Sequence, residues 1–163
     1  MSRSNNEEVK QVMKIFKHLY EKENILGDKQ NISKPKCTIN IMSQYKAQCN
    51  TIMQALEKDG YHGINVNTVN GSQGGEWDYV IFSLKNLGFI TDGNQTNVAL
   101  TRARKGLFVI GNQNLLRCDR VWKEMLDYYG SKGCLVDAQD FPMPIKQKRK
   151  KKRKTSSEEF QIA

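Results

Sequence analysis

A repeated alternation between short β-forming runs and helical patterns is the feature of this sequence that most limits its fold. The run Cys37–Met42 is rich in β-forming residues and leads directly into a helical pattern over 44–59, which stops before Gly60. Further extended segments are predicted at residues 64–69, 79–83 and 107–110. Strands and helices in this order are typical of a layered α/β domain with a mostly parallel sheet.

Helical spacing of apolar residues predicts one more helix on each side of this alternating region. The first covers residues 7–23 and is followed by a predicted loop over 24–36. The second covers 119–129, with Asp119 as its N-cap. Its apolar stripe is expected to lie in the core and consists of Val121, Trp122, Met125, Leu126 and Tyr129.

The C-terminal segment differs in composition from the rest of the chain. The formal net charge is +9, and residues 146–154 supply eight positive charges, so the remainder is nearly neutral. This basic run has the form of a nuclear import signal or a nonspecific nucleic-acid arm, and a merely solubilising tail is the alternative. We therefore divide the chain into a domain over 1–140 and a disordered basic tail over 141–163.

The cysteines and the apolar pattern exclude several classes of protein. Four cysteines lie far apart without a Cys-x-x-Cys pair, which favours buried free thiols over a zinc or redox site: Cys37, Cys49, Cys118 and Cys134. The N-terminus has no apolar signal segment, and no apolar run reaches the length of a membrane span. The sequence therefore predicts an intracellular protein without a membrane partner.

Two arginines that follow a Gly/Gln/Glu loop indicate phosphate chemistry. Arg102 and Arg104 belong to the segment Asn97–Arg104, and the loop is Gly71–Glu76. Guanidinium groups held in a fixed position most often bind anions such as phosphate. The chain has no Gly-x-x-x-x-Gly-Lys-Ser/Thr loop of its own, so the phosphate cradle that these arginines would serve is missing.

The predicted strands also suggest where a ligand would bind. In open parallel sheets, ligands bind outside the carboxyl ends of the strands. Ser43, the segment 70–76 and Asn112 each come within two residues after a predicted strand. We therefore expect these three parts of the chain to share one edge of the sheet.

Three segments, in the same order along the chain, resemble the second RecA-like domain of superfamily 1 helicases of the nonsense-mediated-decay helicase group. They are residues 38–48, 67–83 and 88–112. Within that group, the sequence is most similar to the branch that includes the helicase with zinc finger domain 2. The resemblance implies a three-layer RecA-like fold of the P-loop NTPase class, with helices on both faces of the sheet.

In this family, ATP and Mg²⁺ are bound between two RecA-like domains. The resemblance matches Arg102 to the catalytic arginine finger, and it matches Gln73, Gly74 and Glu76 to the motif that contacts the nucleotide, with Glu76 toward the ribose. Arg104 is left between phosphate support and a solvated charge, since on a helix it would lie on a different side from Arg102. A surface ion pair is the alternative for Arg102, and an ordinary turn is the alternative for the glycines.

The resemblance also implies contacts with a single strand of RNA or DNA, with RNA favoured. Ser43 and Thr68 match positions that contact the nucleic-acid backbone, and a strand-capping role is the alternative for each. Tyr45 and Trp77 could stack on bases, but aromatic residues beside a strand more often belong to the core.

The sequence departs from the family in two respects. The first RecA-like domain, with its phosphate loop and magnesium-binding carboxylates, is not in the sequence, and the loop after Ser83 is shorter than usual. The chain is not expected to hydrolyse ATP alone, and a first RecA-like domain is its expected partner. Two functions remain: the C-terminal motor half of an ATP-dependent helicase, or a non-catalytic RecA-like module that binds nucleic acid or a transcriptional or helicase partner.

Overall fold

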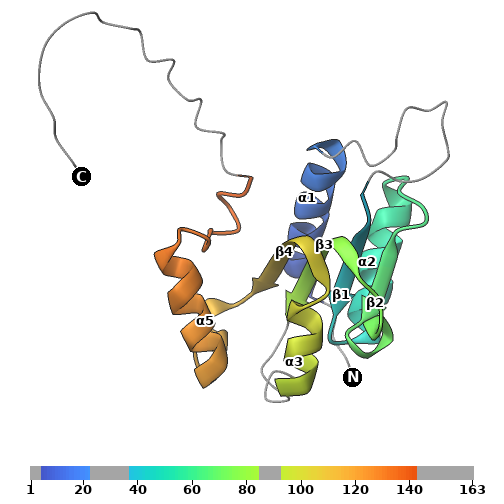
Figure 1. The fold of residues 1–163 in the computed structure, drawn as a ribbon. Helices are drawn as coiled ribbons and strands as arrows, with labels where there is room; N and C mark the ends of the chain where they lie inside the picture. Colours follow the sequence, from blue (N-terminus) through green and yellow to red (C-terminus); the bar gives the residue numbers. More distant parts are fainter. Residues whose placement is uncertain (1–4, 23–36, 85–92, 143–163) are drawn as a thin grey trace, which may run out of the picture.

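A parallel sheet forms the centre of the protein in a computed structural model, which describes residues 5–22, 37–84 and 93–142 (Figure 1). The predicted loop over 24–36, the shortened loop after Ser83 from residue 85 on, and the basic run lie outside the described residues. The described strands are β1 (Ile39–Ser43), β2 (Asn65–Thr68), β3 (Trp77–Leu84) and β4 (Ala103–Gly111). Their order is β2-β1-β3-β4, and every neighbouring pair is parallel.

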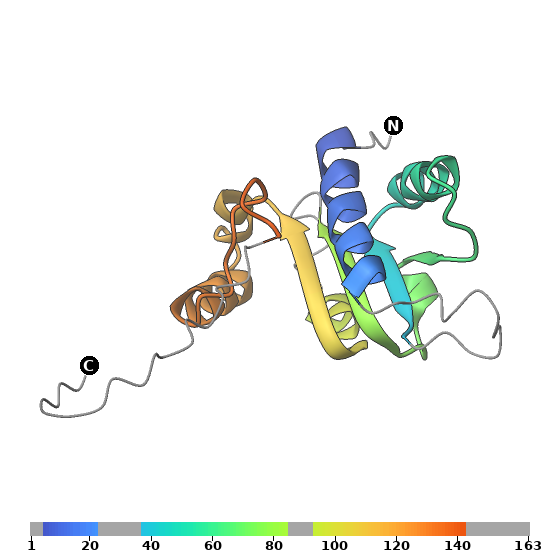
Figure 2. The ribbon, with the colours of Figure 1, turned by 90° about the horizontal axis from the view of Figure 1, so that it is seen from above.

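Two helices cover one face of the sheet. They are α1 (Asn6–Lys22) and α2 (Lys46–Lys58), and Figure 2 shows them on the same side of the strands. Their apolar sides meet alternate residues of β1 and β3, including the fully buried Ile41 and Ile81. Because the side chains of a strand alternate between its two faces, Met42 and Val80 face the opposite layer.

The opposite layer contains α3 (Gly93–Leu100), α4 (Gln113–Leu116) and α5 (Arg120–Ser131). Ala99, Leu116 and Trp122 from these helices join the second core cluster. Two cores, one on each face of a parallel sheet, make the three-layer α/β arrangement of a RecA-like fold. The predicted fold class is therefore confirmed.

The stripe on α5 is less buried than its sequence predicts. Asp119 does cap the helix, since its side chain accepts hydrogen bonds from the backbone N–H groups of Val121 and Trp122. Trp122 is buried, but Val121 and Tyr129 are 57% and 48% exposed. The prediction that both belong to the core is wrong, because α5 lies beside β4, the last strand in the order (Figure 2), and only Trp122, Met125 and Leu126 of its stripe join the second core cluster.

The cysteines match the prediction of burial only in part, and Phe141 packs against the core. Cys37 and Cys49 are buried as predicted, but Cys118 and Cys134 are exposed, so the prediction of buried thiols is wrong for these two. Phe141, the first residue of the expected tail, packs against the core and lies 6.1 Å from Phe108, measured between ring centroids. Within the described ranges, every helix is too short or too polar to cross a bilayer.

Candidate nucleotide and nucleic-acid sites

The predicted site residues lie on opposite edges of the sheet. Ser43 and Thr68 are the last residues of β1 and β2 and pair in register at the carboxyl edge. Glu76 directly precedes β3, and Arg104 is the second residue of β4, so both lie at the amino edge. The expectation that the whole segment 70–76 shares an edge with Ser43 is wrong, because this segment leads the chain back from the end of β2 to the start of β3.

Asn112 follows β4 at the carboxyl edge, as expected, and its side chain has a local structural role. The Asn112 side-chain oxygen accepts hydrogen bonds from the backbone N–H groups of Asn114 and Leu115, at 3.0 and 3.4 Å. Asn112 is therefore the N-cap of α4, where an asparagine oxygen satisfies donors that the helix leaves unpaired.

The loop between β2 and β3 is held by Thr68 and needs glycine at one position. The Thr68 Oγ1 accepts a hydrogen bond from the Gly71 N–H at 3.2 Å, and the Thr68 carbonyl accepts one from the Ser72 hydroxyl at 2.9 Å. Gly74 has a φ of 79°, which side chains rarely adopt, and a Cβ there would meet no atom within 4 Å. Gln73 and Gly74 are both exposed, so this part of the loop is open to a ligand.

The indole ring of Trp77 covers the backbone at Gly75. A Cβ at Gly75 would clash with ring carbons of Trp77, so any larger residue there requires the indole to move. Trp77 is partly buried against the second core cluster. These contacts account for Trp77 by packing, and base stacking is not needed to explain it.

The buried Asn40 and the half-buried Asn67 connect this loop to the centre of the sheet. Asn40 on β1 is fully buried, and its Oδ1 accepts a hydrogen bond of 3.1 Å from the Asn67 side chain. Its Nδ2 donates to the Ser72 hydroxyl at 3.4 Å. Because buried polar groups cost free energy unless they are paired, this chain of contacts favours one position of the loop.

Arg102 occupies the turn between α3 and β4. Its Nε donates to the Val98 carbonyl at 3.2 Å, and its own carbonyl accepts a hydrogen bond from the Trp77 N–H at 3.0 Å. The first contact uses one of the five N–H donors of the guanidinium group. Arg102 is half-buried, and both its side chain and its backbone are anchored to neighbouring elements.

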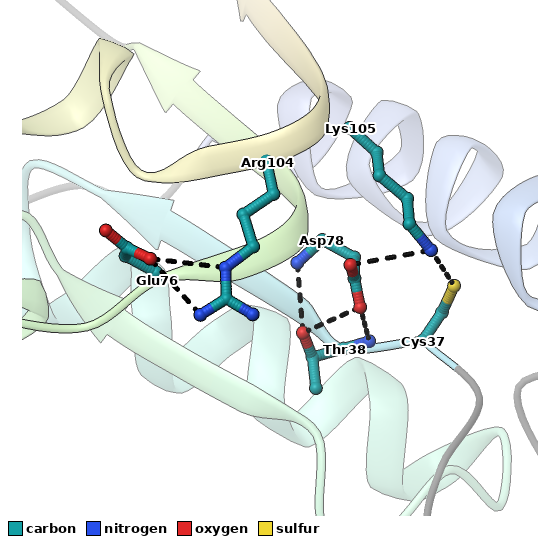
Figure 3. A network of polar contacts seen from close by, with 6 residues as sticks. All are labelled: Cys37, Thr38, Glu76, Asp78, Arg104 and Lys105. Carbon is teal, nitrogen blue, oxygen red and sulfur yellow. Dashed lines mark hydrogen bonds and ion pairs between the residues drawn. The ribbon is translucent and has the colours of Figure 1, made fainter.

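Arg104 contacts Glu76, the predicted ribose ligand. Its Nε and Nη2 lie 3.2 and 3.1 Å from the same carboxylate oxygen of Glu76, and Figure 3 shows the two side chains pointing toward each other. The expectation that Arg104 lies on a helix is wrong, because α3 ends at Leu100 and Arg104 is in β4. The structure thus pairs the predicted ribose ligand with an arginine for which the sequence leaves phosphate support and a solvated charge open.

A second polar group at the amino edge is not predicted from the sequence. The Asp78 Oδ2 accepts hydrogen bonds from the Thr38 N–H and hydroxyl at 2.9 and 3.2 Å (Figure 3). The Lys105 Nζ lies 3.4 Å from the Asp78 Oδ1 and 3.1 Å from the Cys37 sulfur. The bond from the Thr38 N–H, aided by the Lys105 charge, lowers the pKa of Asp78 below its ordinary value. An acidic residue two positions after Glu76 was the available sequence signal.

A shift in strand register explains how consecutive basic residues reach two carboxylates. Trp77 pairs with Ala103, whereas Tyr79 pairs with Gly106, so β4 has one more residue than β3 over this stretch. Such an irregularity turns side chains away from strict alternation. Arg104 therefore reaches Glu76, while Lys105 reaches Asp78.

The carboxyl edge contains a row of three hydroxyl residues in register, Thr68, Ser43 and Ser83. Ser43 and Ser83 are fully buried. The Ser83 hydroxyl donates to the Glu8 carboxylate at 2.8 Å, whereas the Ser43 hydroxyl has no hydrogen-bond partner within the described part of the chain. The structure therefore brings the two predicted nucleic-acid residues together but covers one of them.

Over residues 5–22, 37–84 and 93–142, no group of three or more His, Cys, Asp or Glu side chains could hold a metal ion. The carboxylates at the amino edge instead pair with Arg104 and Lys105.

Comparisons with known proteins place the chain beside helicases. A family model described as an AAA domain, AAA_12, matches residues 1–114. The chain is 35% identical over 156 residues to human 3'-5' exoribonuclease HELZ2, covering 84% of this chain and 5% of that protein. It is 36% identical over 116 residues to the uncharacterized ATP-dependent helicase MJ0104 of Methanocaldococcus jannaschii, covering 69% of this chain and 17% of that protein. It is 35% identical over 111 residues to the ATP-dependent helicase NAM7 of Saccharomyces cerevisiae, covering 61% of this chain and 11% of that protein. The chain thus spans a small part of each relative.

A solved structure supports the fold independently. It is the C-terminal domain of a possible DNA helicase from Lactobacillus plantarum WCFS1, with a TM-score of 0.50 at 16% identity. The match covers 74% of this chain and 79% of that one. At this level of identity, the likeness concerns the α/β fold alone.

Proposed function

The chain belongs to the AAA_12 family of AAA domains as a superfamily 1 helicase C-terminal domain, and from this premise we propose that it is the motor half of an ATP-dependent RNA or DNA helicase. The observation that carries the proposal is the separation of two polar sites on opposite edges of one sheet. The segment 69–76 joins these edges, so a ligand at one edge can influence the other.

The amino edge fits one side of a nucleotide site. Gly74 leaves open space beside the backbone, and the Glu76 carboxylate is exposed and held by Arg104. A carboxylate in this setting can accept hydrogen bonds from ribose hydroxyls. Arg102 supplies the anchored guanidinium group that a finger toward the γ-phosphate requires, where it would stabilise charge developing on the transferred phosphoryl group.

The other side of the nucleotide site must come from a first RecA-like domain. ATP bound with Mg²⁺ supplies the scissile phosphoanhydride bond, and the family uses both. The sequence contains no phosphate loop of the Gly-x-x-x-x-Gly-Lys-Ser/Thr type. We therefore propose that this chain holds the ribose and the γ-phosphate, while the partner domain holds the metal and the remaining phosphates.

The carboxyl edge of the sheet is the proposed binding site for single-stranded RNA or DNA. Thr68 and Ser43 would donate hydrogen bonds to backbone phosphates, a type of contact that does not depend on base sequence. Thr68 is half-buried, and its backbone and hydroxyl hold the first turn of the segment that leads toward Glu76. This connection gives a physical route from the bound nucleic acid to the nucleotide.

The experiment measures nucleic-acid-stimulated ATPase activity of the chain alone, and of the chain mixed with a first RecA-like domain. We expect turnover only in the mixture, and we expect Arg102→Ala to reduce it by about 10³-fold, the lower range for arginine fingers. Arg120→Ala is the matched control, because its side chain is 91% exposed on α5. A mixture no faster than the first domain alone would contradict the motor proposal, and nucleic-acid binding without turnover would favour the non-catalytic module.

We further propose that the basic run over 146–154 directs nuclear import. Its support is the clustering of eight positive charges in nine positions. Replacing Lys150, Lys151 and Lys152 by glutamine in a fluorescent fusion should abolish nuclear accumulation. An unchanged distribution would leave the run as a nonspecific nucleic-acid arm or a solubilising tail.

A further inference from the structure

The start of α1 lies across the carboxyl edge of the sheet. The Glu8 Oε2 accepts the hydrogen bond from the Ser83 hydroxyl at 2.8 Å, although the two residues are 75 positions apart. The other carboxylate oxygen accepts a hydrogen bond from the Asn5 side chain at 3.0 Å. Both oxygens of Glu8 are therefore engaged, and the carboxylate has a fixed position.

The turn that contains Glu8 is fastened to α2. The Asn5 N–H donates to the Gln48 side chain at 2.9 Å, and the Gln48 amide donates back to the Asn5 carbonyl at 3.4 Å. Gln48 is buried in the first turn of α2, next to the end of β1. Figure 1 shows the N-terminal end of α1 at the same end of the sheet as the carboxyl end of β1.

Beneath this turn, one hydroxyl is buried without a partner. Ser43 pairs in register with Ser83, so both side chains lie on the face of the sheet that α1 covers. Ser83 donates to Glu8, but the Ser43 hydroxyl finds no acceptor in the described residues. A buried hydroxyl without a hydrogen bond costs free energy. The Ser43 hydroxyl could therefore donate to an added acceptor, which the described residues do not provide while the N-terminal turn covers it.

We propose that the Glu8 carboxylate takes the place of a nucleic-acid phosphate. The N-terminal turn over residues 5–8 must then move away before RNA or DNA can contact Ser43 and Ser83. This inference rests on the proposed function, because it concerns the same carboxyl edge. A carboxylate oxygen and a phosphate oxygen accept the same hydrogen bond from a serine hydroxyl. Two negative groups cannot share that position, so binding of nucleic acid competes with the hydrogen bond between Ser83 and Glu8.

The proposal adds Ser83 to the row of contacts that the sequence predicts. Thr68 and Ser43 end β2 and β1, Ser83 is the residue before the last of β3, and these adjacent strands lie about 4.8 Å apart. Three hydroxyls at that spacing offer successive donors to a sugar-phosphate backbone that crosses the edge. With the N-terminal turn in place, the third hydroxyl, that of Ser83, already donates its hydrogen bond to Glu8.

The test measures binding of the full chain to a fluorescently labelled oligouridylate by anisotropy, at low and moderate salt. Glu8→Gln keeps the shape of the side chain and removes its charge. Glu7→Gln makes the same charge change one residue away, where Glu7 is exposed and forms an ion pair with Lys10 on the helix surface. We expect Glu8→Gln to strengthen binding by about tenfold, the size of one hydrogen bond to a charged group, and Glu7→Gln to change it by less than about twofold.

A second pair of variants identifies the group that Glu8 covers. Ser83→Ala in the Glu8→Gln background should remove most of the gain, whereas Ser83→Ala alone should have little effect on binding, because Ser83 is already occupied. Thermal unfolding of each variant reports whether Glu8 acts only as a structural cap. In that case Glu8→Gln lowers stability and leaves affinity at the level of Glu7→Gln.

The outcomes separate this inference from the proposed function. Equal affinities for Glu8→Gln and Glu7→Gln, with binding by the unchanged chain, would overturn the role of Glu8 and leave the nucleic-acid site in place. If neither the unchanged chain nor any variant binds the oligouridylate at low salt, the proposed nucleic-acid site itself fails, and the role of Glu8 fails with it.

Discussion

The guanidinium group of Arg104 holds Glu76 across the amino ends of β4 and β3, with Nε and Nη2 3.2 and 3.1 Å from one carboxylate oxygen. The resemblance matches Glu76 to the ribose and leaves Arg104 between phosphate support and a solvated charge, and their contact suggests a division of roles. Arg104 is placed to orient the carboxylate, and Glu76 keeps its second oxygen for a ribose hydroxyl. Both side chains are 59% exposed, so the pair is suited to positioning and contributes little to the stability of the fold.

Replacing Arg104 by alanine tests this division. We expect the KM for ATP of the two-domain mixture to rise several-fold with little change in kcat, because the ribose contact is weakened and the reacting phosphates are not touched. The free energy of unfolding of the chain should change by less than about 1 kcal/mol. A loss confined to kcat would instead mean that Arg104 contacts the transferred phosphate.

Asp78 makes stability depend on acid pH. The pKa of Asp78 is lower in the folded chain than in the unfolded chain, because the Thr38 N–H and Lys105 favour its charged form. Its stabilisation is therefore complete above about pH 4, the ordinary aspartate range, and is lost as the pH falls through the folded pKa. Asp78→Asn should cost about 2 kcal/mol at neutral pH.

Urea unfolding at neutral and acid pH measures this dependence. The difference between the unchanged chain and Asp78→Asn should shrink as the pH falls below about 4. Asp140→Asn, at an exposed carboxylate outside the sheet, serves as the control and should show a small difference at both pH values. A difference for Asp78→Asn that does not vary with pH would exclude the carboxylate charge as the source of the stabilisation.

The buried Asn40 should be sensitive to an apolar substitution. Asn40→Leu removes the acceptor of the Asn67 side chain and the donor to Ser72, and we expect a loss of about 2 kcal/mol in the free energy of unfolding. Asn50→Leu, on the exposed side of α2, should change stability by less than about 0.5 kcal/mol. Chemical denaturation measures both. Equal values for the two variants would show that the asparagine contacts do not stabilise the loop.

Gly74 should resist substitution for a conformational reason. Its φ of 79° is strained for alanine although the space around it is free, so Gly74→Ala should destabilise the chain by about 1 kcal/mol. Gly93 also has free space, has no positive φ and begins α3, so Gly93→Ala should be neutral or stabilising. Thermal unfolding of the two variants separates backbone strain from crowding. Equal shifts in Tm would argue against strain at Gly74.

Much of the fold follows from local patterns in the sequence. The helix predicted over 44–59 is observed as α2, and each predicted strand is present, because periodicity and turn residues act within a few positions of the chain. The resemblance to superfamily 1 helicases is also confirmed, since motifs in a fixed order are a property of sequence. The strands β3 and β4 begin earlier than predicted, because the charged residues Asp78, Arg104 and Lys105 interrupt the apolar pattern near their amino ends.

The alternating α/β order, the glycine at position 74 and the residue types at the candidate sites follow from the sequence alone. Which of these residues contact one another is a property of the folded chain. The pairing of Arg104 with Glu76 depends on the register shift between β3 and β4, and the contact of Glu8 with Ser83 joins residues 75 positions apart. Local patterns contain no information on register or on distant contacts, because both arise when whole elements pack against one another.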